Sequence, residues 1–456
     1  MKFLHLLLIV VTTTSSFAQL PCIKSNTKVI TYSINGVATG NQWTITPELK
    51  PDVLGFGSEK KLNRVVFYTD VDSFVCMAKR GKSYQFYIIL NGKDSALTEI
   101  SVSQPIPKPA RFSKKYIQEH TGKSSFEIPE AQELVHIVMA LTPTGIENTN
   151  MVRHGTDYYK EVMKQFGPWK DHPAVNAMEN HMKNFMYGHV KMDACGYFLD
   201  AGTRLRKDGV YHRMNWSDQN FIEPMVKDLE DFAKKSKFME FFKGHGGYYQ
   251  ELITQAEKYM PIQPQWDWLE KEFPNRYQHY RITFSPLVNG WHTTNHFEDN
   301  GFKQTVMFIC SAEGKSEKLS DKLWEGLMTR VVFSEIDHNY VNPISENYLE
   351  QIDAVFDDRA FWANDTLAGS YNSPYMLFNE YMTWAVFTLY AYDHYDTETF
   401  EAINTRVEKQ MDVGRGFIKF KEFNQKLLEL YRNRSKEKKV FEFYPDILAW
   451  SAKFNG

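Results

Sequence analysis

The chain has 456 residues, of which 43% are hydrophobic and 15% are aromatic, and its formal net charge is −3 at pH 7. This length allows two or three domains, each with its own hydrophobic core. The nearly balanced charge excludes nucleic-acid binding as a function suggested by composition, because such proteins carry a basic surface.

The N-terminus has the pattern of an export signal. Lys2 precedes an apolar run over residues 3–11, and residues 16–18 form a small-x-small cleavage pattern. These features predict a secretory signal peptide over residues 1–18. The apolar run is too short to span a bilayer, and no later stretch is apolar enough. We therefore expect an exported protein, periplasmic or extracellular, without a membrane span.

The composition of the chain changes along its length. Residues 23–103 contain short β-branched and aromatic runs with a hairpin signal at Asn91-Gly92, which predicts a β-rich accessory domain of the sandwich type. Three prolines within residues 104–110 predict a stiff linker. Residues 111–456 have mainly helical patterns with a small sheet, so the predicted fold class is α+β. The expected helices are 130–141, 157–166, 173–186, 221–242, 248–260, 266–273, 321–343, 346–356, 375–393, 405–430 and 441–454, and the expected strands between them are 281–287 and 305–310.

One predicted helix carries a recognisable but incomplete motif. Residues 321–343 have apolar residues at helical spacing and end at a proline, and they include the pentapeptide SEIDH at 334–338. In H-E-x-x-H, two histidines on one helix face bind Zn²⁺, and the glutamate acts on the metal-bound water. Glu335 and His338 keep their places, but Ser334 holds the position of the first ligand. A neutral serine is a poor zinc ligand beside Cys, His, Asp and Glu.

The motif has to be weighed against a simpler interpretation. Residues 132–136 also have the pattern x-E-x-x-H on a predicted helix, so Glu335 and His338 could simply be satisfied by their neighbours. A third residue supports the metal interpretation. Glu380 lies downstream in a predicted helix that is apolar nearly all round, and a buried carboxylate is costly unless it is paired, hydrogen-bonded or bound to metal. Zincins of the gluzincin type take their third ligand from a glutamate on such a second helix.

Several short motifs carry a resemblance to a known family. By these motifs the helical domain resembles a family of secreted bacterial proteins known only as a domain of unknown function and regarded as zincin-like metallopeptidases. The resemblance implies His338 and Glu380 as zinc ligands, Glu335 as the general base, and an extended peptide substrate paired with the edge strand before the helix. Ser334 departs from the family pattern. The motifs are FEIPE at 126–130, EL at 133–134, ALT at 140–142, SPL at 285–287, VNP at 341–343 and NEY at 379–381.

Two hypotheses remain open from the sequence. His292 and His296, in a predicted loop over residues 288–302, are candidate substitute ligands, although the simpler interpretation is two ordinary polar loop histidines. The first hypothesis is an exported zincin-fold metallopeptidase-like protein with a degenerate metal site. The second is a non-catalytic scaffold of the same fold that binds a peptide or a glycan. The missing histidine favours the second, and the retained Glu335 and Glu380 favour the first.

Overall fold

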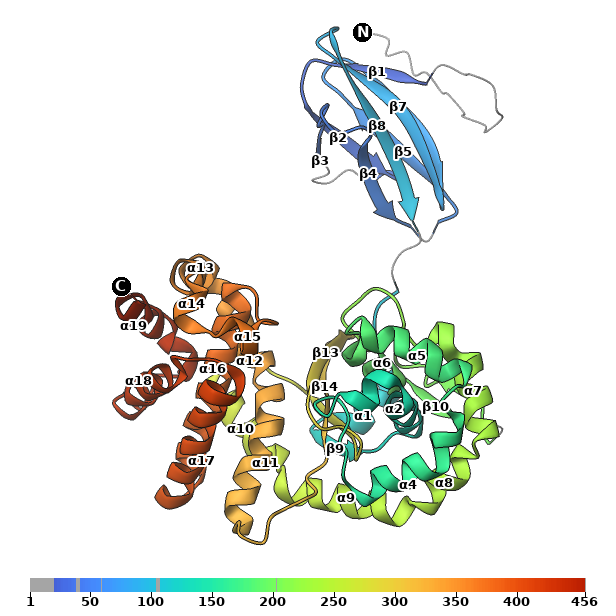
Figure 1. Ribbon diagram of the computed structural model, residues 1–456. Helices are drawn as coiled ribbons and strands as arrows, with labels where there is room; N and C mark the ends of the chain where they lie inside the picture. Colours follow the sequence, from blue (N-terminus) through green and yellow to red (C-terminus); the bar gives the residue numbers. More distant parts are fainter. Residues whose placement is uncertain (1–19, 38–41, 59, 104–106, 202, 456) are drawn as a thin grey trace. The chain divides into compact units, whose positions relative to one another are not determined.

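The computed structural model describes residues 20–37, 42–58, 60–103, 107–201 and 203–455. The predicted signal peptide, residues 1–18, and residues 104–106 of the predicted linker lie outside them. The chain divides into two compact units, residues 1–107 and 108–456 (Figure 1). The first is β-rich and the second is mainly helical, which confirms the α+β class. Among the described residues, no helix combines the length and apolar character needed to cross a bilayer.

The first unit is built from two four-stranded sheets, with strand orders β3-β2-β5-β6 and β1-β7-β8-β4. Its apolar core includes the rings of Phe67, Phe74 and Phe86, whose centroids lie 4.9–6.4 Å apart. Asn91 and Gly92 have positive φ angles at the turn between β7 and β8, as the hairpin signal predicted. The strands are β1 (Cys22–Ser25), β2 (Val29–Ile34), β3 (Gln42–Thr44), β4 (Asp52–Gly57), β5 (Leu62–Tyr68), β6 (Ser73–Lys79), β7 (Lys82–Leu90) and β8 (Asp94–Ser103).

The second unit contains a four-stranded sheet with the order β13-β14-β12-β9. Strands β9, β12 and β14 run parallel, and β13 pairs antiparallel with β14 at the edge. The strand that leads directly to the motif helix, β14, is therefore interior, which corrects the expectation of an edge strand there. A separate hairpin joins β10 and β11. The bounds are β9 (Lys123–Glu127), β10 (Tyr197–Leu199), β11 (Leu205–Lys207), β12 (His279–Ser285), β13 (Thr293–Asp299) and β14 (Phe302–Cys310).

The edge strand β13 occupies much of the segment 288–302, which was expected to be a loop. Phe297 and Asp299 are buried while His296 and Glu298 are exposed, so the segment alternates as a half-buried strand does. The interpretation as a loop was wrong because the few apolar residues of this segment hid the alternation.

Helices precede and follow the sheet along the chain, and in Figure 1 the sheet of the second unit lies between most of the early helices and the late group. Helix α10 (Ile262–Glu272) lies beside α11 (Asp321–Ile336) with the late group. The early helices are α1 (Lys114–His120), α2 (Glu130–Leu141), α3 (Pro143–Glu147), α4 (Asp157–Phe166), α5 (Pro173–Lys183), α6 (Tyr187–Ala194), α7 (Val226–Lys235), α8 (Phe238–Gly244), α9 (Gly246–Tyr259) and α10 (Ile262–Glu272). The late helices are α11 (Asp321–Ile336), α12 (His338–Ser345), α13 (Leu349–Phe356), α14 (Arg359–Trp362), α15 (Asp365–Ala368), α16 (Pro374–His394), α17 (Thr397–Lys409), α18 (Phe420–Arg432) and α19 (Tyr444–Asn455). Short 3-10 or π turns are η1 (Gly167–Trp169), η2 (Glu223–Met225), η3 (Glu346–Tyr348), η4 (Gln410–Gly414) and η5 (Val440–Phe443).

The predicted helix over residues 321–343 is divided into α11 and α12, and Pro343 lies inside α12 instead of ending it. Proline lacks the N–H that would bond to the carbonyl of Asn339, four residues earlier. That carbonyl instead accepts hydrogen bonds from Asn275 Nδ2 at 2.9 Å and from the Tyr277 hydroxyl at 3.2 Å. Two side chains from a distant segment thus satisfy the group that proline leaves free, and the helix continues past it.

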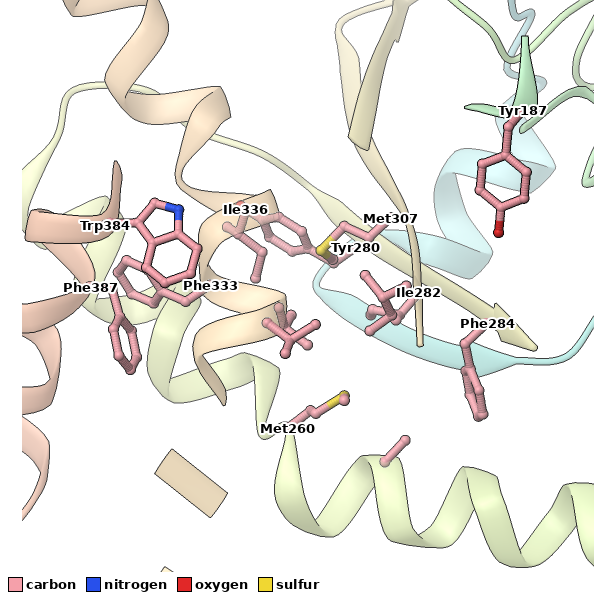
Figure 2. Close-up of a cluster of buried hydrophobic side chains, with 14 of the residues drawn as sticks. Tyr187, Met260, Tyr280, Ile282, Phe284, Met307, Phe333, Ile336, Trp384 and Phe387 are labelled. Atoms are coloured by element: carbon pink, nitrogen blue, oxygen red, sulfur yellow. The ribbon is translucent and has the colours of Figure 1, made fainter. Parts of the chain in front are cut away.

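The core of the second unit fixes α11 between the sheet and α16. Figure 2 shows Phe333 and Ile336 of α11 between Tyr280 and Met307 of the sheet and Phe387 of α16. All five side chains are fully buried, and the Phe333 and Phe387 ring centroids are 5.5 Å apart. Burial of each such side chain contributes about 1.5–3 kcal/mol. The motif residues are therefore carried by a helix that is packed on two sides.

Candidate functional site

The motif residues lie where α11 passes into α12. Glu335 is in the last turn of α11 and His338 is the first residue of α12. Asp337, between them, keeps helical angles of φ −72° and ψ −19°. Its N–H bonds to the carbonyl of Phe333 at 2.9 Å, and its carbonyl accepts from the N–H of Val341 at 2.7 Å. The path of the helix is thus nearly continuous, and residues 334 and 338 remain one turn apart.

His338 and Glu380 converge, as the sequence predicted. Glu380 is buried on α16, and its Oε1 lies 3.4 Å from His338 Nε2. Its other oxygen, Oε2, lies 2.9 Å from Nη2 of Arg415, which directly follows η4. Each oxygen of the Glu380 carboxylate therefore has a cationic partner from a different element.

These partners set the ionisation of the pair. Burial by itself would raise the pKa of Glu380, but Arg415 and His338 outweigh it and hold the pKa at about 2. Burial would lower the pKa of His338, but the neighbouring Glu380, helped by Asp337 and Glu335, raises it to about 9. At neutral pH His338 is thus an imidazolium cation. Its Nδ1 lies 3.2 Å from Asn342 Oδ1, an acceptor that suits a protonated ring.

This arrangement does not fit a zinc ion. An imidazolium has no free lone pair for a metal, and both oxygens of Glu380 are engaged. The Ser334 hydroxyl donates to the Val331 carbonyl at 3.2 Å. Catalytic zinc takes three protein ligands. Within the described ranges there is no group of three or more His, Cys, Asp or Glu side chains placed to hold a metal ion.

The two candidate substitute ligands do not complete a metal group. His296 is exposed on β13. His292 lies just before that strand, and its Nε2 is buried without a hydrogen-bond partner in the described part of the chain. Burial, helped by the nearby cations Lys191, Arg330 and Arg415, lowers the pKa of His292 to about 3, so the ring is neutral. Neither histidine joins His338 and Glu380 in a group of possible metal ligands.

Two further carboxyl groups, those of Glu335 and Asp337, lie close to His338. Glu335 is half-buried, and burial raises its pKa although His338 opposes the shift. Asp337 is fully buried, and neither of its side-chain oxygens has a hydrogen-bond partner among the described residues. Burial raises the pKa of Asp337 well above its ordinary value, although His338 opposes the shift. The site thus holds one firmly ionised carboxylate, Glu380, beside a more weakly acidic Glu335.

Sequence reasoning missed Arg415 and the residues that hold it. The Arg415 guanidinium donates to the Tyr371 hydroxyl and lies over the Trp384 ring at 4.8 Å from its centroid. Trp384 follows Glu380 by one turn of α16, so its place facing the site was within reach of helical spacing. No spacing rule connects Arg415 or Tyr371 to the motif, since both come from irregular segments brought in by the tertiary fold.

The second E-x-x-H segment, on α2, has buried polar groups of its own. Glu133 accepts a hydrogen bond from the Tyr158 hydroxyl at 2.6 Å, and burial raises its pKa to about 7. His136 Nε2 is buried and has no hydrogen-bond partner within the described ranges, and burial lowers the pKa of His136 to about 3. Glu133 thus accepts a hydrogen bond from a neutral hydroxyl, and it forms no ion pair with His136 among the described residues. The second segment differs in this from His338 and Glu380, which form an ion pair.

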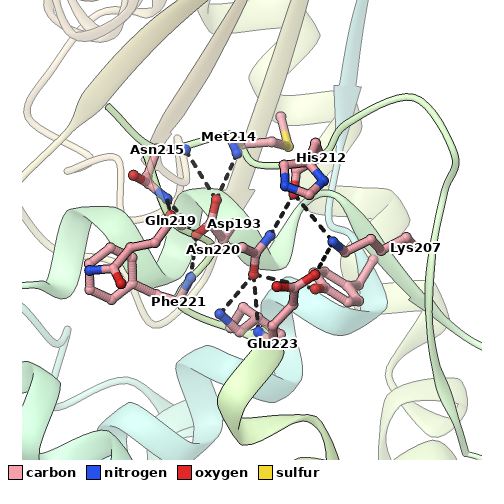
Figure 3. Close-up of polar contacts among 11 residues, drawn as sticks. Asp193, Lys207, His212, Met214, Asn215, Gln219, Asn220, Phe221 and Glu223 are labelled. Atoms are coloured by element: carbon pink, nitrogen blue, oxygen red, sulfur yellow. Dashed lines mark hydrogen bonds and ion pairs between the residues drawn. The ribbon is translucent and has the colours of Figure 1, made fainter. Parts of the chain in front are cut away.

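Asp193 shows what a structural carboxylate looks like in this chain. Figure 3 shows its two oxygens accepting hydrogen bonds from the backbone N–H groups of Met214, Asn215 and Phe221 at 2.7–3.1 Å. The Asn215 side chain adds a fourth bond at 2.6 Å. Asp193 thus secures a loop, with all its acceptor capacity used by uncharged donors. The Glu380 carboxylate differs because its partners are charged side chains of the candidate site.

Comparison with known proteins places most of the second unit in one family. The model of a family described as a domain of unknown function (DUF4932) matches residues 146–450, about two thirds of the chain. A comparison with curated proteins gave no match, and a comparison with solved structures gave none either. The matched range includes Ser334, Glu335, His338, Glu380 and Arg415.

Proposed function

The chain belongs to the DUF4932 family of domains of unknown function, and we propose that it is a non-catalytic, peptide-binding protein on a zincin-like fold. Its site is held together by ion pairs in place of zinc. The observation that carries the proposal is the continuous ion-pair chain from Arg415 through Glu380 to His338, with Ser334 at the first-ligand position. These ion pairs occupy the His338 imidazole and the Glu380 carboxylate, the groups that a metal ion would need as ligands.

The edge strand β13 supports an extended peptide as the ligand. Edge strands bind peptides by adding a strand to the sheet. In the described residues the backbone of β13 pairs with β14 alone, and β13 also contacts α11. The Trp216 indole already donates to the Thr294 carbonyl at 3.2 Å. A peptide would therefore pair along the stretch from His296 to Asp299, beside the motif helix.

A second candidate function is a zinc metallopeptidase, because Glu335, His338 and Glu380 remain together. Zinc at this site would require that Arg415 release Glu380 and that His338 lose its proton. A third ligand would have to come from outside the present arrangement. The ion-pair chain therefore favours the binding protein, and it gives Glu335 no metal-bound water to act on.

Peptide binding and cleavage distinguish the two candidates. The full chain is mixed with a fluorescently labelled library of unstructured peptides, with and without a chelator. The binding protein raises the anisotropy of bound peptides and leaves them intact in mass spectra, whether or not the chelator is present. Cleavage that disappears with the chelator and in Glu335→Gln would establish the peptidase instead.

Export is part of the same proposal. It rests on the signal-peptide pattern of residues 1–18. N-terminal sequencing of the native protein tests it, with a first residue at position 19 expected. A native protein that begins at Met1 would contradict export by this signal.

A further inference from the structure

Arg330 is a cation of the candidate site without an anionic partner. It lies on α11 one turn before Ser334, which lies one turn before His338, so the three residues follow one face of the helix. Arg330 is half-buried, and in the described part of the chain it makes no ion pair or hydrogen bond. Its guanidinium lies over the Trp384 ring, 4.6 Å from the centroid. A charge removed from water in this way is costly unless something pairs with it.

A second guanidinium shares the same ring. Arg415 also lies over Trp384, at 4.8 Å, so the two guanidinium groups are close neighbours of one indole. Burial and, to a smaller extent, Arg415 together lower the pKa of Arg330 to about 10, so Arg330 stays charged at neutral pH. Arg415 is balanced by Glu380, but Arg330 has no acid within 4 Å among the described residues. Glu335 also acts on Arg330 electrostatically, but it forms no ion pair with Arg330 among the described residues, so only Arg415 has an acid in direct contact.

The neighbouring groups do not restore the balance. Lys191 is fully buried, and its ammonium donates to the carbonyls of Trp291 and Phe308 instead of an acid. Burial lowers the pKa of Lys191 to about 7, so it is partly charged at neutral pH. His292 and Cys310 are neutral, because burial lowers the pKa of the imidazole and raises the pKa of the thiol.

We propose that Arg330, which shares the Trp384 ring with Arg415, binds an anionic group of the ligand, a carboxylate or a phosphate. A guanidinium donates two parallel hydrogen bonds to either group, and such charge-assisted bonds are the stronger ones. Ser334 helps because it is smaller than the histidine of the H-E-x-x-H pattern. It leaves the helix face between Arg330 and His338 less crowded. The inference deepens the proposed binding function, on which it rests for the presence of a ligand.

The test measures binding of small anions to the full chain by isothermal titration calorimetry. The probes are acetate and inorganic phosphate, with chloride at matched ionic strength as the reference. Tri-alanine with a free C-terminus is compared with its amide, which distinguishes a peptide carboxylate from a free anion. Saturable binding to one site is expected, because a single side chain, Arg330, binds the anion. The probe with the highest affinity identifies which anionic group the site takes.

The variants are Arg330→Gln, Arg330→Lys and, as a matched control, Arg406→Gln on the exposed face of α17. Losing a hydrogen bond to a charged group should weaken binding by about 10- to 100-fold in Arg330→Gln. Arg330→Lys keeps the positive charge but loses the two parallel hydrogen bonds of the guanidinium, so an intermediate loss of affinity is expected. Arg406→Gln should bind as the wild type does. Equal affinities of the wild type and Arg330→Gln, or no anion binding by the wild type, would overturn the proposal.

Thermal unfolding separates ligand binding from a structural role. Phosphate or acetate should raise the midpoint of the wild type and leave that of Arg330→Gln unchanged. A lower midpoint of Arg330→Gln in anion-free buffer, with unchanged anion affinity, would assign Arg330 to the packing on Trp384 and refute the inference. Stoichiometric zinc with retained anion binding would refute the proposed function alone. A zinc-free protein that binds no anion would refute this inference alone.

Discussion

Replacing Glu380 by glutamine removes the one acid shared by Arg415 and His338. The guanidinium stays charged at any accessible pH, so it is left without a counterion. Breaking a buried ion pair from one side costs about 3–5 kcal/mol. The Arg415 and His338 side chains are each 24% exposed, so water relieves part of the penalty. We therefore expect the free energy of unfolding of the second unit to fall by about 3 kcal/mol, the lower end of the range.

The same change alters the titration of His338. Its pKa is about 9 because Glu380 outweighs burial. Without that carboxylate, burial dominates, and the pKa should fall below the ordinary value of 6.5. The direction in which stability changes with pH follows from the raised pKa of His338. The raised pKa stabilises the wild type fully below pH 6.5, and this contribution is lost as the pH rises through about 9. Glu380→Gln should lose this dependence between pH 6.5 and 9.

The assay is urea unfolding followed by tryptophan fluorescence at several pH values. Nine of the ten tryptophans lie in the second unit, and Trp43 alone lies in the first. The matched control is Glu401→Gln, an exposed carboxylate of α17, which should change stability by less than about 0.5 kcal/mol. Equal stabilities of Glu380→Gln and Glu401→Gln would refute the account of the ion-pair chain.

Two other predictions concern the interior of the second unit. Burial raises the pKa of Glu133 from 4.5 to about 7, so the folded state binds this proton more tightly and stability falls as the pH rises from 4.5 to 7. At about 1.4 kcal/mol per unit the loss is about 3 kcal/mol. Glu133→Gln should flatten the pH dependence of unfolding in that window, and an unchanged slope would contradict the assignment. A Cβ at Gly326 would lie 2.3 Å from Ile403 Cδ1, so Gly326→Ala should cost about 1–3 kcal/mol in denaturant unfolding. The matched change Gly247→Ala, which meets no atom within 4 Å on α9, should be neutral or stabilising, and equal effects at both sites would refute the packing argument.

Helices with strong periodicity were the most predictable part of the fold. The predicted helices over 130–141 and 157–166 coincide with α2 and α4, and the one over 375–393 falls short of α16 by one residue at each end. Two predicted helices were wrong because the chain leaves the α-helical conformation within them. The segment 221–242 is interrupted at Lys237, whose φ is 58°, and 405–430 is divided by η4 and the segment after it. Neither break has a proline within it to announce it.

The site was predictable in its local half. The convergence of His338 and Glu380 could be predicted, because each is a polar residue on a helix whose other residues are mostly apolar. The role of Arg415 could not be predicted, because its contact with Glu380 depends on how the tertiary fold places the end of η4 beside α16. Continuation of the helix past Pro343 was equally hidden, since it depends on Asn275 and Tyr277. Contacts between distant segments decide both.

Zinc titration of the wild type beside Ser334→His tests the central claim most directly. A histidine at position 334 lies one turn from His338 and completes a three-ligand set with Glu380. Structural zinc sites in zinc-finger peptides gain about 10–16 kcal/mol on binding, which exceeds the about 3–5 kcal/mol needed to break the Glu380 ion pairs. We expect no stoichiometric zinc in the wild type and about 100-fold tighter binding in Ser334→His. Tight zinc binding by the wild type, equal to that of Ser334→His, would contradict a site held together by ion pairs.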